Sequence, residues 1–288
     1  MYQAELGTVV TYNPLSLSVD NTLGDVLRLW TAMEFHDWPV IDDAQRLVGI
    51  MSEGDIVRAI GDLAATYSID RHLGYEQLFL RTAGQIMSPV SATISRHEQK
   101  ASALYQLLSQ QKHSLPVVDD ERLVGLVTTT DFLREFTYGD LAACREPATR
   151  YVEETPESVD CEATLESAEQ AMFFGISESI GVVNGNLTLG VVTRRDLRLA
   201  KCRLDTRRIL SEEFSISISG PVTLREIAAR SPIVRPGARL SEAAVWMIES
   251  RRQAVAVVNQ AGRLVGALTE KGILKAMVGH ESWQAGIR

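Results

Sequence analysis

One short pattern occurs four times along the 288-residue chain. Each copy is an apolar, strand-like stretch with a glycine in its middle and a hydroxyl residue at its end, and the copies span residues 47–52, 123–128, 188–193 and 264–269. Their glycines are 76, 65 and 76 residues apart, so the second half of the chain repeats the first at an offset of 141. A unit that was duplicated, and then duplicated again as a pair, explains this spacing.

The residues around each copy predict one order of elements, β-α-β-β-α. In the first unit, Thr22 and Asp25 form a capping box, and apolar residues follow at helical spacing. An apolar strand at 38–42 and a polar turn at 43–46 then lead into the repeated pattern as a hairpin. A final helix follows the hydroxyl residue. We therefore expect an α/β (α+β) fold of four such units, arranged as two tandem pairs because one unit is too small to bury a core alone.

The spacing also predicts boundaries. The expected units are residues 1–61, 78–138, 146–201 and 220–280, and the expected pairs are 1–140 and 145–288. Segments 61–82 and 202–222 are longer connectors that we expect to be partly helical, and residues 139–149 mark the boundary between the pairs.

Charge and composition narrow the class of protein. The chain is 45% hydrophobic and 23% charged, the balance of a globular protein rather than of a disordered tail, a fibre or a coiled coil. No apolar run reaches the roughly 18 residues that cross a bilayer, and residues 1–10 do not resemble a secretory signal. We therefore expect a cytoplasmic protein with no membrane contact. The net charge of −8 argues against binding of a nucleic-acid backbone.

The usual signatures of metal sites and catalysis are missing from the sequence. Cys144, Cys161 and Cys202 lie far apart and form no C-x-x-C pair, so we expect reduced thiols. The chain has no H-E-x-x-H, G-x-S-x-G, P-loop or G-x-G-x-x-G pattern. We therefore expect no enzyme, no metal and no resident cofactor.

The repeated pattern ends in residues that suit a phosphorylated ligand. A hydroxyl and a carboxylate lie three residues apart at Ser52 and Asp55, Thr128 and Asp131, and Thr193 and Asp196. A helix start attracts phosphate, and a carboxylate can accept hydrogen bonds from both ribose hydroxyls. Arg58 and Arg134 follow one turn later and could bind phosphate. The same spacing is also that of a capping box, and the residues alone leave both readings open. In the fourth unit Thr269 has no acidic partner, because Gly272 takes its place.

These features together resemble the cystathionine-β-synthase (CBS) domain family. The resemblance rests on the order of elements, on the strands Trp38-Pro39-Val40-Ile41-Asp42 and Leu115-Pro116-Val117-Val118-Asp119, and on the glycine-to-carboxylate tail. It covers nearly the whole chain as four repeats, or two Bateman modules. In that family the Ser or Thr contacts phosphate or ribose and the Asp holds the ribose of an adenosine-containing ligand. The third unit departs from the pattern at Gly181 and Asn184.

The resemblance implies further binding residues. His36 and His113 stand three residues before Pro39 and Pro116, where the family can reach a bound phosphate. Alternatively, both histidines are helix C-terminal residues favoured by the helix dipole. The corresponding residues are Glu178, which would repel phosphate, and Gln253. Family positions for the wall of the base pocket are Ser16, Thr93, Pro39 and Pro116.

We therefore expect a non-catalytic regulatory protein that binds an adenine nucleotide of the AMP, ADP or ATP class and signals to an unidentified protein partner by a conformational change. We expect a homodimer, with ligand bound in the N-terminal pair. One alternative is an assembly module with vestigial sites. Another is a nucleic-acid-binding CBS protein, for which the local basic run is Arg203, Arg207 and Arg208, although such a run is usually a solvated helix face.

Overall fold

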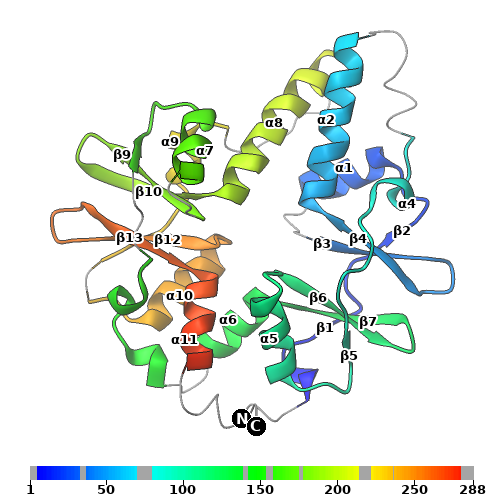
Figure 1. The fold of residues 1–288 in the computed structure, drawn as a ribbon, viewed down its shortest axis with the longest axis horizontal. Coiled ribbons are helices and arrows are strands. Elements are labelled where there is room, and N and C mark those ends of the chain that lie inside the picture. The colour runs from blue at the N-terminus through cyan, green and yellow to red at the C-terminus, as the bar shows by residue number, and fades with distance from the viewer. Residues whose placement is uncertain are drawn as a thin grey trace.

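Four small sheets with their helices are arranged as a ring in the computed structural model (Figure 1). The structure describes residues 5–32, 37–69, 80–138, 142–153, 158–174, 178–213, 222–235 and 237–279. Each sheet is built on the strands of one predicted unit, with residues 11–12 added to the sheet of the second, and the two halves of the chain form opposite sides of the ring.

The N-terminal half contains two units with the predicted order. The first comprises β2 (Leu17–Ser18), α1 (Leu23–Ala32), β3 (Asp37–Ile41), β4 (Leu47–Ser52) and α2 (Glu53–Ile69). The second comprises β5 (Ile94–Ser95), α5 (Lys100–Ser109), β6 (Ser114–Asp119), β7 (Arg122–Thr128) and α6 (Thr129–Tyr138). In both, the first strand pairs parallel with the middle strand, which forms an antiparallel hairpin with the last strand.

The C-terminal half repeats this order twice. The third unit comprises β8 (Ser158–Asp160), α7 (Leu165–Phe174), β9 (Ser179–Asn184), β10 (Leu187–Thr193) and α8 (Arg194–Glu213). The fourth comprises β11 (Ile233–Val234), α10 (Leu240–Ser250), β12 (Ala254–Val258), β13 (Leu264–Thr269) and α11 (Glu270–Gly279). The strands pair as in the first half. The predicted fold class, four β-α-β-β-α units in two tandem pairs, is therefore confirmed.

The segment that leads into each unit crosses to the other unit of its pair. Strand β1 (Thr11–Tyr12) pairs with β7 of the second unit, and Ser88, after helix α4 (Ala83–Ile86), bridges to Ile50 of the first. Helix α9 (Leu224–Ala228) packs on β10, and Glu153, after the short helices η2 (Ala142–Arg145) and η3 (Ala148–Tyr151), bridges to Ala267. Residues 5–12, which the sequence groups with the first unit, thus contribute Leu6 and Val9 to the core of the second.

The repeated glycines explain how these crossings fit. A methyl group on Gly125 would lie 3.3 Å from the carbonyl oxygen of Thr11, and one on Gly190 would lie 2.8 Å from Cβ of Ser231. Gly49 faces Met87 and Gly266 faces Glu153 in the same way. The sequence pattern predicts a close approach at these strands. The group that approaches is the crossing segment.

The two pairs close into a ring within one chain. Helix α2 of the first unit packs on α8 of the third, and α6 of the second packs on α10 and α11 of the fourth (Figure 1). The second contact is a continuous apolar core that includes the buried side chains of Phe132, Phe136, Met247, Ile273 and Leu274. The sequence left open whether the pairs meet within one chain or across a dimer, and the structure shows contact within the chain.

The tryptophans and cysteines differ in burial. Trp30 is buried in the core of the first unit, whereas Trp246 is 45% exposed on α10. The connectors are partly helical, as expected, because α2 extends to Ile69 and α8 to Glu213. Cys144 and Cys161 are buried, and the side chain of Cys202 lies outside the described residues.

The crossing predicts opposite effects for one substitution at two glycines. Gly266→Ala places a methyl group against the backbone of Glu153 and should lower the free energy of unfolding by about 1–3 kcal/mol. Gly61→Ala, in the exposed middle of α2 with nothing within 4 Å, should raise it by about 0.5–1 kcal/mol. Denaturant titration measures both. Equal effects at the two positions would contradict the role given to Gly266.

Candidate functional site

The three hydroxyl-and-carboxylate sequences form one hydrogen-bonded arrangement. In the first, the backbone N–H and Oγ of Ser52 donate to Oδ2 of Asp55 at 2.8 and 2.6 Å, and the Asp55 N–H donates to Ser52 Oγ at 3.2 Å. The Thr128–Asp131 and Thr193–Asp196 pairs repeat this within 0.1 Å. Thr22 and Asp25 form the same arrangement at the start of α1. The local geometry is therefore that of a capping box, and only the outer carboxylate oxygen, Oδ1, distinguishes the sites.

Protein groups already bond to Oδ1 in two of the three cases. Asp55 is 1% exposed, and its Oδ1 accepts from Arg58 and, at 2.7 Å, from Ser88 Oγ of the crossing segment. Asp196 Oδ1 lies 3.0 Å from Nη1 of Arg252, which the fourth unit contributes. A ribose could reach these oxygens only by displacing those donors.

Asp131 is different. Its Oδ1 lies 3.5 Å from Nη1 of Arg134, whose side chain is 57% exposed. Burial raises the pKa of Asp131 despite the hydrogen bonds from Thr128 and the nearby Arg134. The hydrogen bonds from Thr22, by contrast, lower the pKa of Asp25. A carboxylate that is buried at a cost to its charged form is typical of binding positions.

The other predicted residues are spread over the first pair. Ser16 and Thr93 are half-buried just before β2 and β5, and Pro39 and Pro116 are buried in β3 and β6. Thr93 lines a cavity of about 400 Å³ between the first two units, together with Val48, Val90 and Val118. His36 lies outside the described residues. The structure does not gather these residues into one place, and their roles at a base pocket stay predictions.

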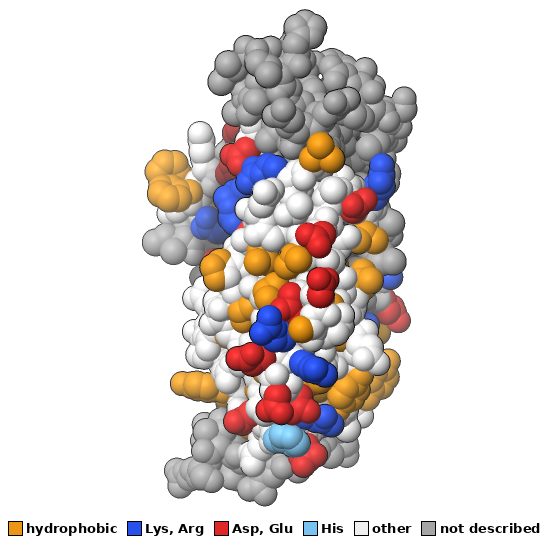
Figure 2. Space-filling model, turned by 90° about the vertical axis from the view of Figure 1, so that its right-hand side faces the viewer, with side chains coloured by type: hydrophobic (Ala, Val, Ile, Leu, Met, Phe, Trp, Pro, Cys, Tyr) orange, Lys and Arg blue, Asp and Glu red, His pale blue; other side chains and the backbone are white. Residues whose placement is uncertain are grey.

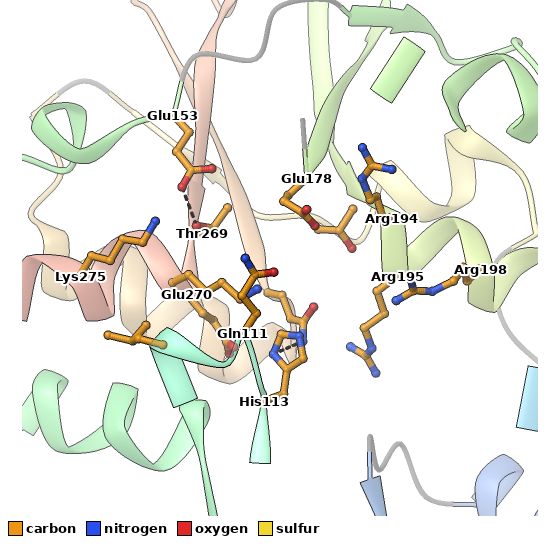
Figure 3. Close-up of a pocket in the computed structure, with 14 residues that line it drawn as sticks. Gln111, His113, Glu153, Glu178, Arg194, Arg195, Arg198, Thr269, Glu270 and Lys275 are labelled. Atoms are coloured by element: carbon orange, nitrogen blue, oxygen red, sulfur yellow. Dashed lines mark hydrogen bonds between the residues drawn. The ribbon is translucent and has the colours of Figure 1, made fainter. Parts of the chain in front are cut away.

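A second cavity, of about 250 Å³, lies where the second, third and fourth units meet (Figure 3). It brings together two of the predicted residues, His113 and Thr193. It also contains Glu178, Gln253 and Thr269, which occupy the equivalent sequence positions in the C-terminal units. Nε2 of Gln253 lies 3.4 Å from Nδ1 of His113, so the equivalent residues of the second and fourth units touch.

Positive charge gathers around this cavity in an otherwise acidic chain. Five cationic side chains line it, namely Arg194, Arg195, Arg198, Lys271 and Lys275, against three acidic ones, Glu153, Glu178 and Glu270. Thr193 and Thr269 end their strands here, directly before α8 and α11 begin. Cations, hydroxyls and helix starts together suit an oxyanion. On the outer face shown in Figure 2, acidic and basic side chains are intermixed.

The basic residues of this cavity were not predicted from the sequence. The motif marks the hydroxyl and the acid, but Arg194 and Arg195 lie between them, and Arg198, Lys271 and Lys275 lie on the helix that follows. A comparison of the residues after the hydroxyl in the four units would have found them, since units three and four are basic there. The fourth unit also has a carboxylate that the sequence hides, because Thr269 Oγ1 donates to Glu153 at 3.3 Å.

The residues inside the motif also join the two pairs. Between the first and third units, Arg195 donates to both carboxylate oxygens of Glu53. Between the second and fourth, the hydroxyls of Thr129 and Thr130 donate to Glu270 at 3.0 and 3.3 Å. Both contacts lie beside the cavity, so the ring closes at the positions that line it.

The described residues contain neither a membrane-spanning helix nor a cluster of metal-binding side chains. No helix there has the length and apolar character needed to cross a membrane. Nor do three or more His, Cys, Asp or Glu side chains in that part of the chain gather as a metal site would require.

The two capping boxes with opposite pKa shifts allow a matched test. Asp131→Asn removes a charge that burial disfavours and should leave the melting temperature unchanged or higher at pH 7. Asp25→Asn removes a charge that its hydrogen bonds favour and should lower the melting temperature by about 2 °C.

The pH dependence has opposite signs for the two residues. Asp131 lowers the free energy of unfolding as the pH rises from 3.8 through its raised pKa. Asp25 raises the free energy of unfolding at neutral pH, and this stabilisation is lost as the pH falls from 3.8 through its lowered pKa. Calorimetry of the two variants between pH 3 and pH 7 measures this difference. If Asp131→Asn lowered the melting temperature at pH 7 more than Asp25→Asn does, the assignment would be contradicted.

Comparison with known proteins agrees with this architecture. A family model for the CBS domain matches residues 6–62, 83–138 and 224–279, which is more than half of the chain. Protein MJ1225 from Methanocaldococcus jannaschii, described as a proposed archaeal homolog of g-AMPK, has a solved structure with a TM-score of 0.72 and 17% identity, and the match covers 95% of this chain and 100% of that one. Its sequence is 21% identical over 200 residues, 66% of this chain and 67% of MJ1225. An uncharacterized conserved protein from Pyrococcus horikoshii matches with a TM-score of 0.59 and 19% identity, over 96% of this chain and 100% of that one.

An inosine-5′-monophosphate dehydrogenase is also similar in part. The enzyme from M. jannaschii is 26% identical over 135 residues, which are 46% of this chain and 24% of that protein. The matched segment thus spans about a quarter of the enzyme's length. The third unit lies outside the three regions matched by the family model, although its strands and helices have the same order as the others. On the three matched regions and this shared architecture, the chain belongs to the CBS domain family.

Proposed function

We propose that this chain is a non-catalytic regulatory protein that binds an adenosine-containing nucleotide of the AMP, ADP or ATP class. The observation that carries the proposal is the central cavity, where cations of the third and fourth units surround the threonines that precede α8 and α11. Membership of the CBS family supports it, because in that family the Ser or Thr at the position of Thr193 and Thr269 contacts the phosphate or ribose of an adenosine-containing ligand. The four units, with the predicted boundaries except for residues 5–12, which pack with the second unit, are the proposed ligand-binding domains.

The cavity suits the phosphate end of a nucleotide. Its volume of about 250 Å³ is slightly below the range of about 300–1,000 Å³ that is usual for ligand pockets, so it suits a part of a nucleotide. Charge-assisted bonds from Lys271 and Arg198 would hold the phosphate oxygens. The hydroxyls of Thr193 and Thr269 would join them by exchanging the hydrogen bonds that they donate to Asp196 and Glu153. Each bond to a charged group contributes about 1.5–3 kcal/mol, enough for a tenfold or larger change in affinity.

Asp131 is the strongest candidate for a ribose site in the N-terminal pair. Its outer oxygen is the least occupied of the three, and a ribose there would replace a weak contact with Arg134. Asp55 would first have to lose Ser88. We therefore keep Thr128, Asp131 and Arg134 as the proposed site of the first pair, with His113 between this pair and the central cavity.

Signalling would follow from the ring. A ligand shifts a conformational equilibrium only by binding one state more tightly than another. A ligand in the central cavity touches three units, so it can favour one relative arrangement of the pairs. A protein partner or a second copy of the chain would read that arrangement, and both partners are part of the proposal.

The second candidate function, an assembly module with vestigial sites, also has an observation in its favour. Protein donors occupy the outer oxygens of Asp55 and Asp196, as they would in a unit that no longer binds ligand. The two functions differ in whether nucleotide binds at all.

The proposal predicts selective binding that depends on cavity cations. With AMP, ADP or ATP at about 100 times the dissociation constant, the free energy of unfolding should rise by about 2.7 kcal/mol, a shift of several degrees in melting temperature. Lys271→Ala and Arg198→Ala should each weaken binding about tenfold or more. Thermal shift and isothermal calorimetry measure the two effects.

Arg263→Ala is the matched control. Arg263 is an exposed cation at the far end of the strand that Thr269 ends, so its loss should leave affinity unchanged. A folded wild type that shows no shift with any adenine nucleotide would favour the assembly module. Equal losses in all three variants would place the ligand outside the cavity.

A further inference from the structure

Arg195 belongs to two structures at once. It lies in the first turn of α8 and lines the central cavity. Its Nε donates to Oε2 of Glu53 at 2.8 Å and its Nη2 donates to Oε1 at 2.5 Å. Glu53 is the first residue of α2, in the N-terminal pair. Figure 3 shows the Arg195 side chain turned away from Arg194 and Arg198.

The two side chains are shielded from water. Each is 15% exposed, so their attraction is weakened less by solvent than that of a surface pair. Burial would lower the pKa of Arg195, but the fork to Glu53 and the nearby Asp196 and Glu270 keep it raised. Arg195 is therefore a fixed cation whose charge is neutralised by a carboxylate from the other pair.

A carboxylate and a phosphate present similar oxygens to a guanidinium, and both form two parallel hydrogen bonds with it. Glu53 thus occupies Arg195 in the way that a phosphate would. If a phosphate enters the cavity, it and Glu53 are two like charges beside one cation in a site with little water. Glu53 also holds the guanidinium in one orientation, which favours phosphate binding, but the repulsion between Glu53 and the phosphate is the larger effect.

We propose that an anionic ligand in the cavity competes with Glu53 for Arg195, so that binding weakens the contact between the first and third units. This inference rests on the proposed function and states how that site is regulated. Coupling between two sites is reciprocal. A change that weakens the contact between Glu53 and Arg195 must therefore raise the affinity for the ligand.

The opposite side of the ring responds differently. There, Glu270 accepts from the hydroxyls of Thr129 and Thr130, and these groups of the second unit are neutral. The apolar core that α6 shares with α10 and α11 stays in place. Competition therefore acts on the side where α2 meets α8, and the ring opens there.

The affinity test uses calorimetry with three probes, AMP, ATP and inorganic pyrophosphate. Glu53→Gln should lower the Kd of each anion that binds the wild type by about tenfold. Glu53→Asp, which keeps the charge but shortens the reach, should act in the same direction by a smaller factor. The control is Glu162→Gln, which removes a carboxylate from an exposed pair with Arg225 and should leave the Kd unchanged.

A second measurement needs no variant. In the wild type, saturating ATP should speed hydrogen exchange of the amides of α2, whereas α1 in the same unit should keep its rate. A Kd that is unchanged or higher in both Glu53 variants, or an α2 exchange rate that ATP does not increase, overturns the competition while the proposed function stands. A wild type that binds none of the three probes overturns both.

Discussion

The structure depends on a close approach at four glycines, of backbone at Gly125, Gly190 and Gly266 and of the Met87 side chain at Gly49. Each unit's last strand is covered by the segment that leads into the other unit of its pair, and a side chain at Gly125 or Gly266 would block that approach. Through the crossing, each unit of the first pair takes core residues from a segment outside its own β-α-β-β-α order, Leu6 and Val9 for the second unit and Ala83 and Ile86 for the first. It also brings polar groups to the end of the strand, since Ser88 reaches Asp55 and Glu153 reaches Thr269. The crossing segments thus add side chains to the ends of the first and fourth repeats of the strand pattern.

The ring closes through two contacts that are equivalent in position and different in chemistry. Glu53 meets a guanidinium across one side, and Glu270 meets two hydroxyls across the other. A pseudo-symmetric fold therefore has one junction made by an ion pair and one made by a carboxylate with two hydroxyls, both beside the central cavity. An anionic ligand can move the pairs at the first junction, because it can compete there for Arg195.

The sequence predicted the units, the hairpins and the capping boxes because these depend on residues close together in the chain. Thr22 and Asp25, for example, are close enough to specify the start of α1 by themselves. The crossings were not predicted because they depend on contacts between units. Asp55, Asp131 and Asp196 look alike in sequence, and what separates them comes from Ser88 and Arg252, far along the chain. The cavity cations were missed because the motif marks the hydroxyl and the acid, whereas the charges lie between and beyond them.

The proposed function requires that cations of the C-terminal pair bind the phosphates of an adenine nucleotide. Cations, hydroxyls and helix starts are the groups that a phosphate needs, and the cavity holds all of them in a chain of net charge −8. A crystal structure of the protein grown with ATP would show where the phosphates bind. Phosphate oxygens are expected within hydrogen-bond distance of Thr193 or Thr269 and of Lys271 or Arg198. Phosphates bound elsewhere on the ring, with the cavity holding none, would contradict this expectation.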